Sequence, residues 1–270
     1  MKLGITAFVT DESAHPAVLA KAIEERGFDA LFLAEHSHIP VSRETPYPRG
    51  GEMARAYYRA LDPFVALTAA AAATSTLKLG TGIALLIQRD VLHTAKSVAS
   101  LHLLSGGRFL FGVGVGWNRE EMRNHGTDPR TRGALLDEQI QALRTLWTSD
   151  EAEFHGVHVD FDAVWQWPKP PSPVPVYIGG NSTAALDRAK RLGAGWLPNV
   201  LPDPEAAAAQ IAQAGSVPVT ATSAPPDPAL LDAYAEAGAE RVTLALPAGS
   251  EGDTLRKLDA LAALVARVSR

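Results

Sequence analysis

Short apolar runs alternate with longer amphipathic segments along the chain. Residues 3–9 form one such run, and residues 30–34 form a second one without polar alternation, which is typical of strands buried on both faces of a parallel sheet. Between them, apolar residues recur at helical spacing over 16–23, and Gly27 lies where a helix C-cap is expected. The same reading predicts strands at 78–86, 108–114, 174–178, 195–198, 217–221 and 241–246, and helices at 62–74, 92–104, 131–147, 183–192, 204–214, 228–237 and 254–268.

The pattern amounts to eight strands, each followed by a helix. Eight such units in about 250 residues predict an α/β protein of the (β/α)8 TIM-barrel class, with residues 1–270 as a single domain. A doubly wound open sheet is the competing architecture, and it usually needs fewer strands. Two connections are long, at 35–61 after the second strand and at 148–173 before the fifth, where 154–161 resembles a hairpin. Loops of this length usually carry function or act as a lid.

Composition excludes several classes of function. Apolar residues make up 46% and charged residues 20% of the chain, and the net charge is -5, so no global positive field favours nucleic acid. The chain has no cysteine, which excludes disulfide scaffolds and thiolate chemistry. Metalloprotease, P-loop and GxSxG signatures are absent, and no metal site is expected. No apolar stretch is long enough for a membrane span and no signal peptide is recognised, so a cytoplasmic protein without membrane or nucleic-acid partners is expected.

The second strand is followed by Glu35 and His36. Catalytic residues of a barrel lie at the C-terminal ends of its strands, and a carboxylate beside an imidazole can orient it for proton transfer. Neighbouring residues on a strand point to opposite faces, however, so the two side chains need not touch. A loop histidine without a role is the alternative.

Glycines mark the third and fourth strands. Gly82 lies inside the third strand, where a glycine often marks a bulge or the close approach of a ligand. The fourth strand ends GVGVGWN, with glycines at 112, 114 and 116 before Trp117. Glycines at alternate positions free one face, so Gly114 could lie against a flat ligand with Trp117 as a pocket wall. Tight packing inside the barrel is the alternative explanation.

The fifth strand ends in Gly179 and Gly180, and Asn181 and Ser182 then open a helix. The free amides of a helix N-terminus bind anions, most often phosphate. A capped helix without a ligand is the alternative. The loop at 35–61 adds a set of arginines and tyrosines that could form a lid over an anionic ligand, although a solvated loop explains them too: Arg43, Arg49, Arg55, Arg59, Tyr47, Tyr57 and Tyr58.

Several segments together resemble one family. They are FDALFLAEH, AKSVASLHLLSGGRFLFGVGVGWNREE, PVYIGG and GAGWLPN, of which the second is the most specific. They are similar to the luciferase-like monooxygenase family and, within it, to the oxidoreductases that use the deazaflavin coenzyme F420.

The resemblance implies where a cofactor would lie. Glu35 and His36 would be next to the ring, and a non-proline cis peptide at Gly82–Ile83 would back it. The phosphate would lie near 179–182, in agreement with the anion site inferred from the glycines and the cap. Two departures limit what is carried over. Glu35 stands where Asp is frequent, and Trp117 stands where some deazaflavin dehydrogenases have a Glu, so that acid role is not transferred.

These considerations predict an oxidoreductase that transfers a hydride between coenzyme F420 and a small organic substrate. His36 is the candidate proton donor, and Glu35 would contact the ring or tune His36. FMN shares a tricyclic ring and a phosphate, so an FMN-dependent monooxygenase is the alternative. A flavin-binding barrel without turnover, acting as a carrier, is a second alternative.

The resemblance also implies a homodimer that packs helices near the second to fourth strands. The Ala-rich helix at 62–74 would permit close approach of a second copy. Light scattering at micromolar protein should therefore give the mass of a dimer, and a monomer mass would contradict this expectation.

Overall fold

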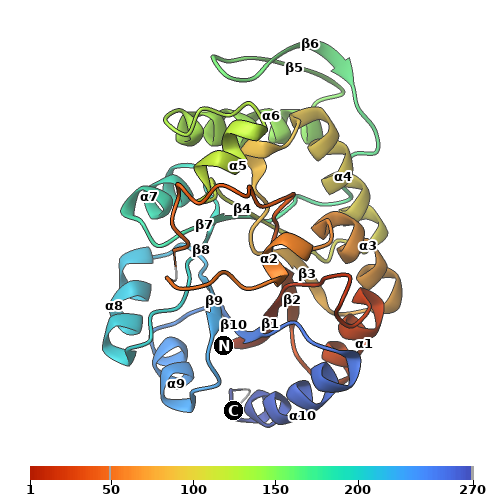
Figure 1. The fold of residues 1–270 in the computed structure, drawn as a ribbon. Helices are drawn as coiled ribbons and strands as arrows, with labels where there is room; N and C mark the ends of the chain where they lie inside the picture. Colours follow the sequence, from red (N-terminus) through yellow and green to blue (C-terminus); the bar gives the residue numbers. More distant parts are fainter. Residues whose placement is uncertain (49, 269–270) are drawn as a thin grey trace.

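Eight parallel strands form a barrel in the computed structural model, which describes residues 1–48 and 50–268 (Figure 1). The strand order is β8-β7-β4-β3-β2-β1-β10-β9, and bridges from Trp196 to Val219 and from Asn199 to Thr222 close the ring between β8 and β9. The predicted barrel is therefore confirmed. Its strands are β1 (Lys2–Ala7), β2 (Ala30–Leu33), β3 (Lys78–Thr81), β4 (Phe109–Val113), β7 (Val176–Gly179), β8 (Gly195–Leu197), β9 (Thr220–Ala224) and β10 (Arg241–Leu246).

Helices surround the barrel, and the antiparallel hairpin of β5 (Glu151–His155) and β6 (Asp160–Trp165) lies outside their ring (Figure 1). The helices are α1 (Pro16–Glu25), α2 (Ala56–Arg59), α3 (Pro63–Ala73), α4 (Val91–Leu104), α5 (Arg119–Asn124), α6 (Arg132–Thr148), α7 (Thr183–Arg191), α8 (Pro204–Ala214), α9 (Pro228–Glu236) and α10 (Glu251–Val268), with a 3-10 turn, η1 (Leu86–Gln88). Within the described residues, no helix has the length and apolar character that a membrane span requires.

The largest departure from the predicted elements is at the third strand. We expected a strand over 78–86, but β3 ends at Thr81. A cis peptide follows at Gly82–Ile83, and η1 then begins at Leu86. The apolar run continues because Leu85, Leu86 and Ile87 remain buried after the strand has ended. β9, which corresponds to the strand predicted at 217–221, begins at Thr220, three residues later than predicted. It follows Pro218, which has no amide hydrogen to donate to a neighbouring strand.

A small apolar cluster fills the barrel interior beneath the strand ends. Its buried members are Ala30, Phe32, Leu110, Tyr177 and Leu197, and Ile83 packs against it. A side chain at Gly80 would place its Cβ 2.4 Å from the Phe32 ring. The glycine is therefore required by the size of Phe32. The interior is closed at this level, so a ligand must lie above it, at the C-terminal ends of the strands.

The end of α1 is tied to the turn before β3 by one carboxylate. Glu24 accepts hydrogen bonds from the amides of Ser75, Thr76 and Leu77 and from the Thr76 hydroxyl. Burial alone would raise the pKa of Glu24, but these hydrogen bonds outweigh it and lower the pKa from 4.5 to about 2. A carboxyl whose pKa is depressed in the folded state stabilises the fold above its unfolded pKa and loses this contribution as the pH falls.

Glu24→Gln should lower the free energy of unfolding at neutral pH by about 1–2 kcal/mol, because charge-assisted hydrogen bonds are replaced by weaker ones. The variant should also lose less stability than the wild type between about pH 4.5 and pH 2. Urea unfolding at several pH values measures both effects. The adjacent, exposed Glu25→Gln is the matched control, and an equal loss in the control would contradict the assignment.

Candidate active site

A hollow of about 360 Å³ lies at the C-terminal ends of the strands. We call it the central hollow. It is bounded by the residues after β2, β3, β4, β7 and β8, and the 34–60 segment crosses in front of it (Figure 1). Seven of the residues chosen from the sequence line it together: Glu35, His36, Gly82, Ile83, Trp117, Gly179 and Gly180. The fold thus brings separate motifs to one place.

The floor of the central hollow is the segment after β3. The predicted cis peptide at Gly82–Ile83 is confirmed. Ile83 packs on the interior cluster, and its side chain fits against two glycines, because a Cβ at Gly114 or Gly179 would lie 2.2 or 2.5 Å from it. Ile83 therefore presents an apolar surface at the floor of the hollow.

Of the three alternating glycines of β4 and its end, only Gly116 lines the central hollow, and all three lie against a neighbouring segment. Added Cβ atoms at Gly112, Gly114 and Gly116 would meet Thr81, Ile83 and Leu85 of the neighbouring segment at 2.0, 2.2 and 3.0 Å. Tight packing is therefore the correct explanation, and the expectation of free space beside these glycines is wrong. Gly114 lies behind Ile83, and the absence of a side chain at Gly114 leaves room for the Ile83 side chain.

The His36 side chain is held in place by a carboxylate whose role the sequence does not indicate. Its Nδ1 lies 2.9 Å from Oε2 of Glu121, and the two side chains are 6% and 1% exposed. A carboxylate accepts, so Nδ1 carries the hydrogen and Nε2 is the nitrogen left for a ligand. Asn118 caps α5 by accepting from the amides of Glu120 and Glu121, and thereby places Glu121 beneath the histidine.

The other oxygen of Glu121 is buried without a hydrogen-bond partner among the described residues. A buried carboxylate with an unpaired oxygen costs folding free energy, and such groups are retained where chemistry requires them. In the sequence, Glu121 is one of two adjacent acids shortly after Trp117, and nothing there indicates a role for it. No spacing rule links it to His36, which lies 85 positions earlier.

Glu35 has a different set of contacts. Its Oε2 accepts from the amide of Leu85 at 2.6 Å, and its Oε1 accepts from Nε of Arg89 at 2.7 Å. Arg89 also binds Asp62, the N-cap of α3, and lies over the ring of Phe64. Burial alone would lower the pKa of Arg89, but the charges of Glu35 and Asp62 raise it. Both Glu35 oxygens thus fix the segment after the cis peptide, which favours a positioning role, while contact with a cofactor ring stays a prediction.

The turn before α7 has its own internal contacts. Gly180 has φ +117°, a conformation that side chains rarely adopt. Both polar atoms of the Asn181 side chain bind the backbone of Asn199, and the Ser182 hydroxyl accepts from the amide of Ala185 as the helix cap. The side chains of Asn181 and Ser182 are therefore already engaged, and what this turn offers a ligand is backbone: the first-turn amides of α7.

Aromatic rings from the 35–61 loop form one wall. Tyr57 lies 5.3 Å from the His36 ring between centroids, and Trp117 lies 5.9 Å from it. Tyr47 contacts both Tyr57 and Trp117. The arginines of this loop do not gather over the hollow. Arg55 and Arg59 pair with Asp11 and Glu12, Arg43 donates to the Pro40 carbonyl, and Arg49 lies outside the described residues.

The family follows from a model of luciferase-like monooxygenases, which matches residues 9–242. The chain belongs to the luciferase-like monooxygenase family. Membership in this family makes it an enzyme, as the sequence predicted, and the match covers the residues of the central hollow except Thr6 and Phe8. An uncharacterized protein of Mycobacterium tuberculosis is 36% identical over 98% of this chain and 99% of its own length.

One further sequence relative bears on the branch of the family, and two solved structures bear on the fold. The F420-dependent glucose-6-phosphate dehydrogenase of Nakamurella multipartita is 31% identical over 67% of this chain and 50% of its own length. Among solved structures, the monooxygenase RslO1 from Streptomyces bottropensis superposes with a TM-score of 0.79 at 20% identity over the whole of both chains. The coenzyme F420-dependent tetrahydromethanopterin reductase of Methanopyrus kandleri gives 0.72 at 18% identity over 99% of both. The structural likenesses establish the shared barrel.

Glu121→Leu should release His36, because leucine has a similar size but no acceptor for Nδ1–H. Nitrogen NMR of the imidazole rings should show His36 protonated at Nδ1 in the wild type and without this preference in the variant. His155, whose Nδ1 lies 2.7 Å from Asp160 on the β5–β6 hairpin, is the internal control. An unchanged His36 spectrum would show that Glu121 does not set its tautomer.

Proposed function

We propose that the protein is an F420-dependent oxidoreductase that transfers a hydride between coenzyme F420 and a small organic substrate. The observation that carries the proposal is the pairing of His36 with Glu121 at the rim of the central hollow. The F420-dependent relatives support the cofactor: the dehydrogenases of Nakamurella multipartita and Amycolatopsis mediterranei are 31% and 30% identical over about two thirds of this chain. Both relatives act on glucose 6-phosphate by name, and that substrate is not carried over.

The residues present fit a flat ring with a phosphate. The floor at Gly82–Ile83 is apolar and level with the strand ends, and Trp117 and Tyr57 bound the space on one side. Gly179 and Gly180 line the hollow at the end of β7, the strand beside β4, where the amides of α7 begin. A ring on Ile83 would therefore place its phosphate toward the α7 N-terminus, and the positive end of the helix would stabilise that charge.

When bound, coenzyme F420 accepts or donates a hydride at C5 of its ring. His36 moves the accompanying proton at Nε2, because Nδ1 is committed to Glu121. In the reducing direction His36 would start as the imidazolium, give its Nε2 proton to the substrate and then be protonated again from solvent. Glu121 keeps the imidazole ring of His36 in one orientation. Its negative charge also stabilises the imidazolium that forms in the reverse direction. Trp117, Tyr47 and Tyr57 limit the access of water.

The substrate side adjoins the central hollow. A second hollow of about 520 Å³ shares Thr6, Phe8, Tyr47, Tyr57 and Ser223 with it and continues along Ala245–Gly249. The arginines at its edge, Arg55 and Arg59, are neutralised by Asp11 and Glu12. A cavity with aromatic walls and, among the residues that the structure describes, no unpaired cation favours an uncharged, largely apolar substrate. Enones, ketones and unsaturated lactones are the classes to screen with the reduced cofactor.

The FMN-dependent monooxygenase remains the second candidate, because solved structures of the same fold include a Baeyer–Villiger monooxygenase in complex with FMN, at a TM-score of 0.62. Titration of the purified protein with each cofactor separates the two, and F420 should bind more tightly. Binding of FMN without binding of F420 would reverse the order. Tight binding of either cofactor with no reaction toward any donor or acceptor would favour the second alternative, a flavin-binding barrel that acts as a carrier without turnover.

His36→Ala should separate chemistry from binding. The substitution removes no phosphate contact, so the affinity for F420 should change less than about twofold. Turnover at saturating cofactor should fall about 100-fold or more, the usual effect of losing a positioned proton donor. His93→Ala, on the exposed start of α4, is the matched control. If His36→Ala retains full turnover, the histidine is only a wall of the pocket and the proton comes from water.

A further inference from the structure

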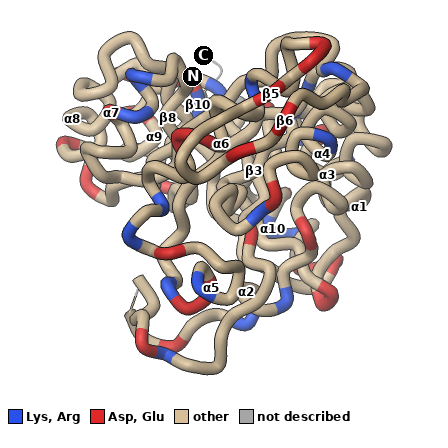
Figure 2. The backbone as a smooth tube through the Cα atoms, turned by 90° about the horizontal axis from the view of Figure 1, so that it is seen from above, with Lys and Arg blue, Asp and Glu red and all other residues tan. Residues whose placement is uncertain are grey.

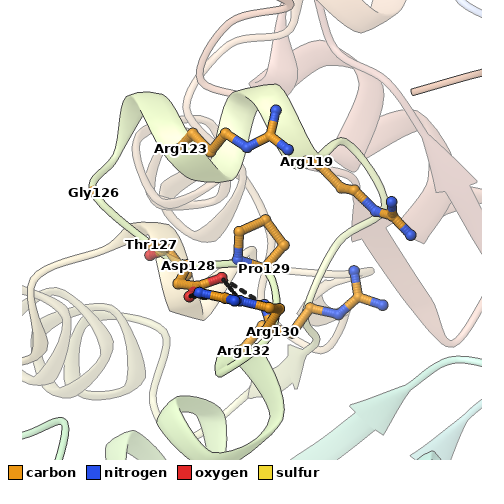
Figure 3. Close-up of a pocket in the computed structure, with 8 residues that line it drawn as sticks. All are labelled: Arg119, Arg123, Gly126, Thr127, Asp128, Pro129, Arg130 and Arg132. Carbon is orange, nitrogen blue, oxygen red and sulfur yellow. Dashed lines mark hydrogen bonds and ion pairs between the residues drawn. The ribbon is translucent and has the colours of Figure 1, made fainter. Parts of the chain in front are cut away.

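A second basic feature lies between α5 and the start of α6. A hollow of about 720 Å³ there is lined by four arginines and one acid: Arg119, Arg123, Arg130, Arg132 and Asp128 (Figure 3). Basic segments lie at and beside α5 in the view from above (Figure 2). The whole chain carries a net charge of -5, so this local excess of positive charge runs against the average. We call it the arginine hollow.

Only some of these charges are available to a ligand. Arg130 binds both oxygens of Asp128, with distances from 2.7 to 3.2 Å, and Arg123 lies 3.5 Å from Glu44. The guanidinium groups of Arg119 and Arg132 have no ion pair or hydrogen bond with any of the described residues. Figure 3 shows both groups extending away from the Asp128–Arg130 pair. Two free guanidinium groups at one hollow form a site for a carboxylate or phosphate, which each can bind through two parallel hydrogen bonds.

The arginine hollow connects with the central hollow. Arg119 and Arg132 also line an intermediate space of about 420 Å³, together with Pro48, Gly116 and Trp117. The last three residues line the central hollow as well. Shared lining residues thus link His36, past Trp117, to the two free arginines, and Glu44, which lies 3.5 Å from Arg123, also lines the intermediate space. The start of α6 also lies beside α7, because Arg188 on α7 donates to the Gly133 carbonyl.

We infer that Arg119 and Arg132 form a subsite for the acidic tail of a ligand whose reactive part occupies the central hollow. On the proposed function, this tail is the chain of linked glutamates that coenzyme F420 carries beyond its phosphate. The ring and phosphate fill the central hollow, and the tail carboxylates reach the free guanidinium groups. An anionic substrate would offer the same chemistry, and the experiment below separates the two sources.

The test uses three natural forms of the deazaflavin: the riboside without phosphate, the phosphorylated form without glutamates, and full coenzyme F420. Their fluorescence gives the affinity of each form without turnover. Arg119→Gln/Arg132→Gln should lower the affinity for full F420 at least about tenfold and weaken its salt dependence, since fewer charges are screened. The affinity for the two tailless forms should change less than about twofold. Asp128→Asn/Arg130→Gln removes the neutralised pair from the same hollow without altering the net charge, and it should leave all three affinities unchanged.

The outcomes separate this inference from the proposed function. If the wild type binds the tailless forms but the double arginine variant binds full F420 as tightly as the wild type does, the protein uses F420 and the tail subsite is wrong. An equal loss for all three forms would also overturn the subsite, because the arginines would then act on the ring or the fold. Unchanged cofactor affinities with a raised KM for an anionic substrate would assign the arginines to the substrate. If the wild type binds no deazaflavin, both proposals fail together.

Discussion

The hydrogen bond between His36 and Glu121 depends on the early end of β3. His36 follows β2 and Glu121 follows β4, and β3 lies between these two strands in the sheet. Beyond Thr81, an isolated bridge from Ala84 to Val113 continues the pairing of this segment with β4. Because β3 ends at Thr81 and the chain turns at the cis peptide, the loops of the outer two strands meet above it. The floor of the hollow and the orientation of the histidine are consequences of the same local change in the backbone.

A network of charged side chains fixes the backbone segment that follows β3. Glu35 accepts a hydrogen bond from the Leu85 amide after the turn and another from Arg89. Arg89 also donates to Asp62, which caps α3. Three elements around the site are thereby joined. The Glu35 end of the network is buried, where such hydrogen bonds are stronger than at the surface, and the Asp62 end is exposed. The acids at the rim thus have separate tasks: Glu35 fixes the backbone under a ligand, and Glu121 fixes the side chain that would act on it.

The barrel could be predicted from the sequence, because each strand is a short apolar run and each helix repeats at its own period. The cis peptide followed from Gly82 together with the family resemblance, and His36 and Trp117 followed from their place after a strand. The roles of Glu35 and Glu121 could not be predicted, because carboxylates carry no signal for their partner, and the partners lie 50 and 85 positions away. The glycines of β4 were ambiguous for a related reason: a missing side chain can leave space or admit a neighbour, and only the position of Ile83 decides.

A crystal structure of the protein with coenzyme F420 bound would test the account most directly, because it locates the ring relative to His36. We expect the deazaflavin ring on the Gly82–Ile83 segment, with Nε2 of His36 facing its reactive edge and Nδ1 still bound to Glu121. We also expect the phosphate at the N-terminus of α7. A ring bound elsewhere, or a histidine turned so that Nε2 contacts Glu121 and Nδ1 faces the ligand, would contradict the assignment of His36 as the proton-transferring group.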